Sequence, residues 1–234
     1  ARLFLDVAKK HLNKYIITED VTLVDRGAEF ARFSIVGGRA AEFFGGFGLS
    51  QFSAMAPLGS STVTWQAGPI RVVRNDFCGP IGGELYVPAA QSDAFRTFAT
   101  SPNTPARAVP VGDDAVQVHR IEAGIPWPGR EITDEYLPAE TRQLERAVSY
   151  TKGCYLGQEV VARMRSRQVV ERQLVGLSID APTPSFAGVA LLDDEEKPVG
   201  MVTSACHSIA LDRVIGLGYV KSAAAAVGTR LRVL

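Results

Sequence analysis

A cysteine flanked by glycines is the part of the sequence with the clearest capacity for chemistry. It lies in SYTKGCYLGQEVVARMRSR, residues 149–167, where Gly153 and Gly157 bracket Cys154. The two glycines permit positive φ angles and a tight turn into a helix that we expect to begin at Gly157 or the next residue. The thiol would then lie near the positive end of the helix dipole and beside Lys152, and both favour the thiolate. Cys154 is therefore a candidate nucleophile or metal ligand, and burial as a small apolar side chain beneath the turn is an equally good interpretation.

Charged residues follow the cysteine along the predicted helix. Glu159 and Arg163 stand four residues apart, which is the spacing of an ordinary surface ion pair. A local group of arginines could bind a carboxylate or could form a solvated face, and it comprises Arg163, Arg165, Arg167 and Arg172.

The second candidate segment is RIEAGIPWPG, residues 120–129. Glu122 lies one turn after His119, on a predicted helix that is about to end beside an aromatic, proline and glycine loop. A buried carboxylate there could accept two parallel hydrogen bonds from an aminopyrimidinone edge, the edge by which a pterin ring is commonly held. Spacing alone favours the simpler alternative, a helix-terminal glutamate paired with Arg120 or Arg130.

Other familiar sites are not indicated. The glycine-rich segments lack the GK[ST] of a phosphate-binding loop, and no GxSxG motif occurs. His11, His119 and His207 do not have ligand spacings, so we expect no metal site. A cysteine hydrolase would need a histidine near Cys154, and His119 stays open in that role.

The composition is that of a folded, globular protein. Apolar residues make up 46% and charged residues 21%, and the 25 basic and 25 acidic side chains cancel. This balance argues against nucleic acid or an anionic membrane as partner, and no apolar run approaches the length that spans a bilayer. The cysteines Cys78, Cys154 and Cys206 are widely separated, which favours a reducing compartment, and we expect a soluble cytoplasmic protein.

The elements that must position these residues are mixed helices and strands up to about residue 170. Helical spacing predicts helices, and alternation predicts strands. Strands 70–77 and 83–88 should pair, and Asp113 or Asp114 should cap the helix that carries Glu122. The predicted helices are 5–17, 39–44, 90–99 and 115–124, and the other predicted strands are 21–25 and 28–36.

Short strands separated by Gly, Pro and acidic turns dominate the rest of the chain. They indicate a small antiparallel barrel or sandwich after the α+β part. We therefore expect two domains, residues 1–170 and 171–234. The predicted strands of the second are 173–179, 188–193, 198–205, 213–220 and 229–234.

Taken together, these segments resemble one known family. The signature of the YgfZ family of folate-binding proteins, relatives of the glycine cleavage T-protein, is similar to KGCYLGQE with an Arg four residues after its Glu. Four other segments are also similar to that family and occur in the expected order: HLNKYIITEDVTL, RIEAGIP, VGMVTSA and IGLGYV. Aminomethyltransferases share the fold of the family and lack its cysteine motif.

The resemblance implies a fold and a function. The fold is a T-protein-like α+β folate-binding domain with a central cavity, followed by a small antiparallel β-barrel. The function is to bind tetrahydrofolate or a derivative and to assist the synthesis or repair of iron–sulfur clusters, with client enzymes or assembly proteins as partners. The residues carried over are Cys154 as the functional thiol, with Arg120, Glu122, Lys152, Tyr155, Gln158, Glu159 and Arg163 as folate-binding residues.

Three further expectations accompany this resemblance. Family members carry another module before HLNKY that supplies part of the cavity, and we expect that module to be missing here. A folate-dependent aminomethyltransferase, or another one-carbon transferase, is the first alternative function. A non-catalytic scaffold, in which Cys154 is structural, is the second.

Overall fold

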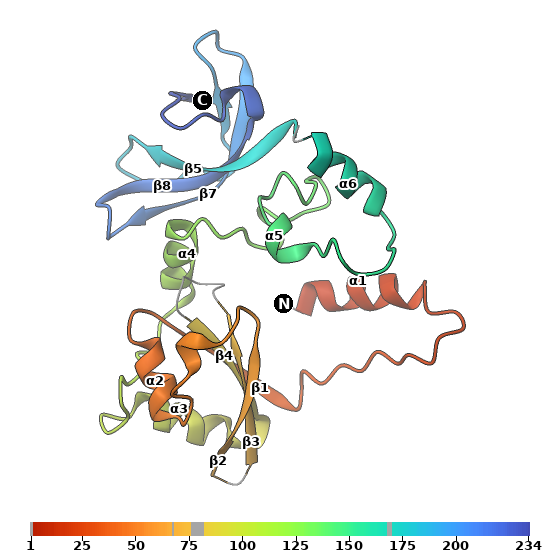
Figure 1. Ribbon diagram of the computed structural model, residues 1–234. Coiled ribbons are helices and arrows are strands. Elements are labelled where there is room, and N and C mark those ends of the chain that lie inside the picture. The colour runs from red at the N-terminus through yellow and green to blue at the C-terminus, as the bar shows by residue number, and fades with distance from the viewer. Residues whose placement is uncertain (1, 67, 76–81, 168–169) are drawn as a thin grey trace. The chain divides into compact units, whose positions relative to one another are not determined.

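The computed structural model describes residues 2–66, 68–75, 82–167 and 170–234 (Figure 1). The packing divides them into two compact units. The first comprises residues 2–75 and 82–109, and the second is Pro110–Leu234. Cys78, one of the three cysteines, lies outside the described residues.

The first unit is built on a four-stranded antiparallel sheet of order β1-β4-β3-β2. Its strands are β1 (Phe30–Val36), β2 (Ser60–Trp65), β3 (Gly68–Arg74) and β4 (Gly82–Pro88). Its helices are α1 (Arg2–Asn13), α2 (Ala40–Gly46) and α3 (Ser92–Thr100), with short 3₁₀ turns at Phe52–Ala54 and Ala89–Gln91.

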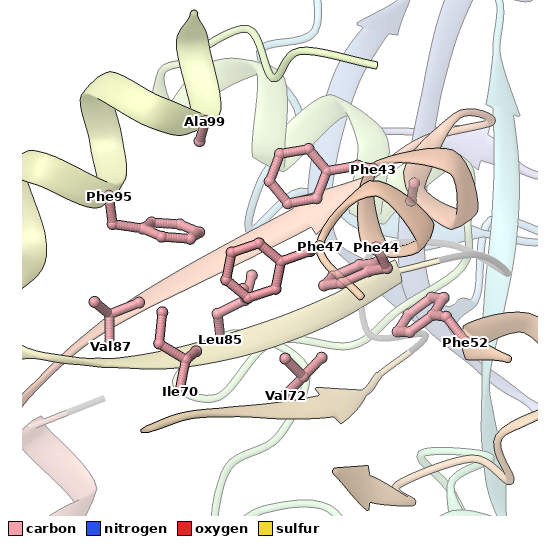
Figure 2. Packing of buried hydrophobic residues seen from close by; sticks show 11 residues of the cluster. Phe43, Phe44, Phe47, Phe52, Ile70, Val72, Leu85, Val87, Phe95 and Ala99 are labelled. Atoms are coloured by element: carbon pink, nitrogen blue, oxygen red, sulfur yellow. The ribbon is translucent and has the colours of Figure 1, made fainter. Parts of the chain in front are cut away.

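Phenylalanines from the helices and the first 3₁₀ turn cover one face of this sheet (Figure 2). The rings of Phe44 and Phe52 stack with centroids 4.0 Å apart. A Cβ at Gly83 would lie 2.7 Å from the Phe44 ring, so only glycine lets β4 come this close to α2. The buried core comprises Ala40, Phe43, Phe44, Phe47, Phe52, Ile70, Val72, Leu85, Val87, Phe95 and Ala99.

The second unit contains a five-stranded antiparallel sheet of order β5-β8-β7-β6-β9. The helix α4 packs against β7 and β8. The helices are α4 (Asp113–Glu122), α5 (Leu144–Ala147) and α6 (Gln158–Arg167), and Ser222–Ala224 is a 3₁₀ turn. The strands are β5 (Arg172–Ile179), β6 (Ala190–Leu192), β7 (Pro198–Ser208), β8 (Arg213–Lys221) and β9 (Arg232–Val233).

The α+β class and the C-terminal strands are confirmed, and so is the pairing of β3 with β4. The strand predicted at 21–25 is wrong, because this exposed segment pairs with no other strand of the described chain. The edge strand β2 was missed, because its first residues, Ser60 and Ser61, favour a loop by composition. The cap prediction is also wrong: Gly112 precedes α4, and both aspartates lie in its first turn, where they favour the positive end of the dipole.

The predicted domain boundary between residues 170 and 171 stays a prediction. The compact units divide the chain between residues 109 and 110, and residues 110–167 belong to the same unit as the C-terminal strands. The reason is a network of buried polar side chains that joins α4 and the loop after it to β7, described below. Among the described residues, every helix is too short or too polar to cross a membrane.

Candidate functional site

A buried ion pair lies at the centre of the second unit. Arg120 of α4 and Glu131 of the following loop are both fully buried, and Arg120 Nη1 lies 2.9 Å from Glu131 Oε2. Arg120 also donates to Gln117 Oε1 at 2.7 Å and to Ser204 Oγ at 2.6 Å. Burial lowers the pKa of the Arg120 guanidinium, and the Glu131 carboxylate acts in the opposite direction.

The Glu131 carboxylate is fully engaged by its neighbours. Its Oε2 accepts the Trp127 N–H at 2.9 Å, and its Oε1 accepts the hydroxyls of Thr203 at 2.8 Å and Ser204 at 2.5 Å. The Tyr219 hydroxyl donates to the backbone oxygen of Glu131 at 2.7 Å, and burial raises the pKa of Tyr219. These bonds fasten α4 and its loop to β7 and β8.

Arg120 is buried inside the second unit, whereas a residue that contacts a ligand has an accessible side chain. Its side chain has no exposed surface, and its guanidinium is occupied by partners of the second unit. Arg120 holds the position of α4, and the expectation that it touches folate has no support in this geometry.

Glu122 is the last residue of α4, and its side chain is exposed rather than buried. Its Oε1 accepts the Ser208 hydroxyl at 2.6 Å, so the pairing with Arg120 or Arg130 that spacing favoured does not form. The Ser208 hydroxyl is the only hydrogen-bond partner of this carboxylate within the described part of the chain. The carboxylate is thus held on one side and open on the other.

Every second residue at the end of β7, the strand that packs against α4, is small and buried. Ser204, Cys206 and Ser208 are buried, whereas His207 is exposed, because successive side chains of a strand point to opposite faces. Burial raises the pKa of the Cys206 thiol, and the nearby Glu122 carboxylate adds to this effect. Sequence reasoning missed Ser204 and Ser208, and the alternating small polar residues in TSACHS were the available signal.

The cysteine segment forms a separate, exposed turn. Cys154 is a free, exposed cysteine, so burial beneath the turn is excluded. The helix α6 begins at Gln158 as predicted, and Gly157 has a φ of +88°, whereas Gly153 is not among the positive-φ glycines. Cys154 is accessible to solvent just before a helix N-terminus.

Neighbouring residues order this turn. Lys152 Nζ lies 4.5 Å from the centroid of the Tyr155 ring, and the Tyr155 N–H donates to Gln158 Oε1 at 3.1 Å. Glu159 and Arg163 are exposed on α6, while the side chains of Arg165 and Arg167 lie outside the described residues. The fourth arginine of the predicted basic group, Arg172, instead pairs with Glu140 at 3.1 Å.

The structure thus places the predicted residues in two groups, one on α4 and one in the turn before α6 and on α6 itself. Two cavities of the second unit have volumes of about 960 and 480 Å³, and neither is lined by a predicted site residue. The larger lies along β5 and residues 224–231, and the smaller lies beside Tyr136 and Thr203. Within the described ranges, no group of three or more His, Cys, Asp or Glu residues could hold a metal ion.

Comparison with known families identifies the two parts of the chain. Residues 4–152 match the model described as GCVT N-terminal domain, and residues 172–234 match the Glycine cleavage T-protein C-terminal barrel domain. The chain belongs to the GCVT family. Cys154 falls in the short interval between the two matched GCVT regions.

Relatives of this GCVT chain include bacterial proteins named aminomethyltransferase. The one from Symbiobacterium thermophilum is 32% identical over 92% of this chain and 58% of its own length, and the one from Geobacillus kaustophilus is 30% identical over the same shares. A chloroplastic protein of Arabidopsis thaliana is 27% identical over 95% of this chain and 50% of its own. The chain therefore spans between half and three fifths of these relatives.

A solved structure shares the GCVT fold. The glycine cleavage system aminomethyltransferase T from Bartonella henselae matches with a TM-score of 0.80 and 20% identity, over 98% of this chain and 62% of that one. At this identity the likeness supports the fold alone.

Proposed function

We propose that this GCVT-family protein binds tetrahydrofolate or a derivative, with Glu122 as the acceptor for the pterin ring. The observation that carries the proposal is the state of the Glu122 carboxylate, which is exposed and bonded only through Oε1 within the described chain. An oriented carboxylate with an open oxygen can accept charge-assisted hydrogen bonds from the N–H groups of an aminopyrimidinone. The family membership supports the same ligand, since the relatives are named aminomethyltransferase.

We further propose that the protein acts as an accessory factor in the synthesis or repair of iron–sulfur clusters, with Cys154 as its functional thiol. The motif KGCYLGQE, which resembles the YgfZ signature, supports this role. The exposure of Cys154 supports it too, because a thiol must be accessible in order to ligate iron or to react with a one-carbon adduct. Lys152, Tyr155 and Gln158 order the turn that presents it.

A folate-dependent aminomethyltransferase is the second candidate, favoured by the names of the bacterial relatives. A turnover assay with an aminomethylated carrier protein separates the two functions. Multiple turnovers would favour the transferase, and an accessory factor should show none.

Titration calorimetry with tetrahydrofolate on the protein at its natural full length tests the ligand. Glu122→Gln should weaken binding by about ten- to a hundredfold, because a hydrogen bond to a charged acceptor contributes about 1.5–3 kcal/mol. Glu145→Gln is the matched control, since Glu145 is an exposed glutamate of α5 in the same unit. Absence of binding to the wild-type protein at millimolar tetrahydrofolate would refute the proposal.

Complementation of cluster-dependent enzyme activity in cells that lack the protein tests the thiol. Cys154→Ala should abolish complementation while the protein stays folded, because an exposed side chain contributes little to stability. Leu156→Ala is the control: Leu156 lies in the same turn with 76% exposure and is not among the carried-over residues. Full activity of Cys154→Ala would favour the scaffold alternative.

A further inference from the structure

A buried hydroxyl lies between the β7–β8 hairpin and the Glu122 carboxylate. Ser208 is the last residue of β7, and it has no exposed surface. Its Oγ accepts the backbone N–H of Leu211 at 3.1 Å, inside the hairpin turn, and donates to Glu122 Oε1 at 2.6 Å. The hairpin itself is fixed by the register of β7 and β8, in which Ser208 faces Arg213.

These two bonds determine where the single proton of the hydroxyl points. A serine hydroxyl has one donor and two acceptor lone pairs. Because the Leu211 N–H can only donate and a carboxylate can only accept, the proton of Ser208 points to the carboxylate. A rigid backbone group thus orients Ser208, and Ser208 orients Glu122.

Glu122 needs such a partner because of its place on the helix. Glu122 is the last residue of α4, where the end of the helix dipole carries partial negative charge and repels its carboxylate. An exposed glutamate also has several rotamers of similar free energy. Within the described residues only Ser208 bonds to its side chain. The bond selects one rotamer and leaves Oε2 open to a ligand.

The same strand also fixes the helix that carries Glu122. Ser204, on the same face of β7 as Ser208, accepts from Arg120 Nη2 at 2.6 Å. One serine therefore holds the backbone of α4 through Arg120, and the other holds the terminal carboxylate.

We infer that Ser208 is a positioning residue for folate recognition, which acts by orienting the Glu122 carboxylate before the ligand binds. This inference rests on the proposed folate-binding function. It assigns to a barrel strand a direct part in forming the pterin site. Loss of the hydroxyl should weaken tetrahydrofolate binding about three- to tenfold, which is the effect of freeing one side chain that was held in its bound conformation.

A double-mutant cycle measured by calorimetry on the full-length protein tests the inference. Ser208→Ala should weaken binding in the wild-type background and should have no further effect in a Glu122→Ala background, which has no acceptor for the hydroxyl. Ser208→Thr, which keeps the hydroxyl, should bind within about twofold of wild type. Ser178→Ala, at an exposed serine of β5, is the matched control and should change nothing.

The outcomes separate the inference from the proposed function. Wild-type binding with unchanged affinity for Ser208→Ala overturns the positioning role alone. An equal loss in both backgrounds also overturns it, because Ser208 would then act on general structure rather than through Glu122. No binding by the wild type overturns the folate proposal and this inference with it. If Ser208→Ala does not fold, Ser208→Cys, which is close in shape and has a weaker donor, takes its place with the same expected loss.

Discussion

Removal of the negative charge at Glu131 should strongly destabilise the second unit. Glu131→Gln keeps the shape of the side chain and leaves the buried Arg120 guanidinium without a counter-charge. The hydroxyls of Thr203 and Ser204 can rotate to accept from the new amide, so the main loss is electrostatic.

The expected cost follows from the burial of both partners. A buried ion pair that loses one partner costs about 3–5 kcal/mol, because the remaining charge stays desolvated. With a urea dependence of roughly 2 kcal/mol/M, the midpoint of unfolding should fall by about 1.5–2.5 M. Since domains have only about 5–15 kcal/mol of stability in total, complete unfolding in water also agrees with the prediction.

Tryptophan fluorescence can report this unit separately. The chain has two tryptophans, and in a Trp65→Phe background only Trp127, which donates to Glu131, remains. The control is Glu195→Gln: the Glu195–Lys197 pair is exposed, so its loss should cost under about 1 kcal/mol. If Glu131→Gln shifted the midpoint no more than this control, the argument that the buried charge holds α4 to the barrel would be wrong.

Three further predictions concern titration, packing and thiol access. The unfolding free energy should fall as the pH rises above about 10, because burial raises the pKa of Tyr219 above its value in the unfolded chain. Tyr219→Phe should remove the contribution of this residue to the pH dependence of the unfolding free energy. It should also cost about 1 kcal/mol at neutral pH, through the lost hydrogen bond to Glu131. Gly218→Ala should cost about 1–3 kcal/mol in thermal or urea unfolding, because its Cβ would lie 2.7 Å from a backbone oxygen, whereas Gly176→Ala in β5 meets no atom and should be tolerated. Brief alkylation mapped by mass spectrometry should label Cys154 and spare Cys206 until the protein unfolds; equal labelling in the native state would contradict the burial of Cys206.

Local patterns predicted the elements of the fold well because each depends on near neighbours in sequence. The short β-branched runs QLVGLSI and RVIGLGYV, for example, correspond to β5 and β8, which pair in register from Arg172 with Lys221. The strand predicted at 21–25 was wrong because a strand-like composition does not supply a partner strand.

The candidate site was less predictable because its partners are far apart in sequence. Glu122 meets a serine 86 residues away, and Glu131 meets one 73 residues away. Nothing near Glu131 in sequence marks it as buried, because it lies in a polar, irregular segment. By contrast, the start of α6 after Gly157 depends on local turn geometry and was predicted correctly.

The buried network explains why α4 folds with the barrel although the matched family regions divide near residue 172. A helix of 10 residues is marginal by itself, and burial of Arg120 would be prohibitive without Glu131 and Ser204. Those partners exist only when β7 is in place, so the position of α4, and of Glu122 at its end, depends on the fold of the barrel. Glu122, the proposed pterin acceptor, lies in the N-terminal matched region, and its position therefore depends on a strand of the C-terminal matched region.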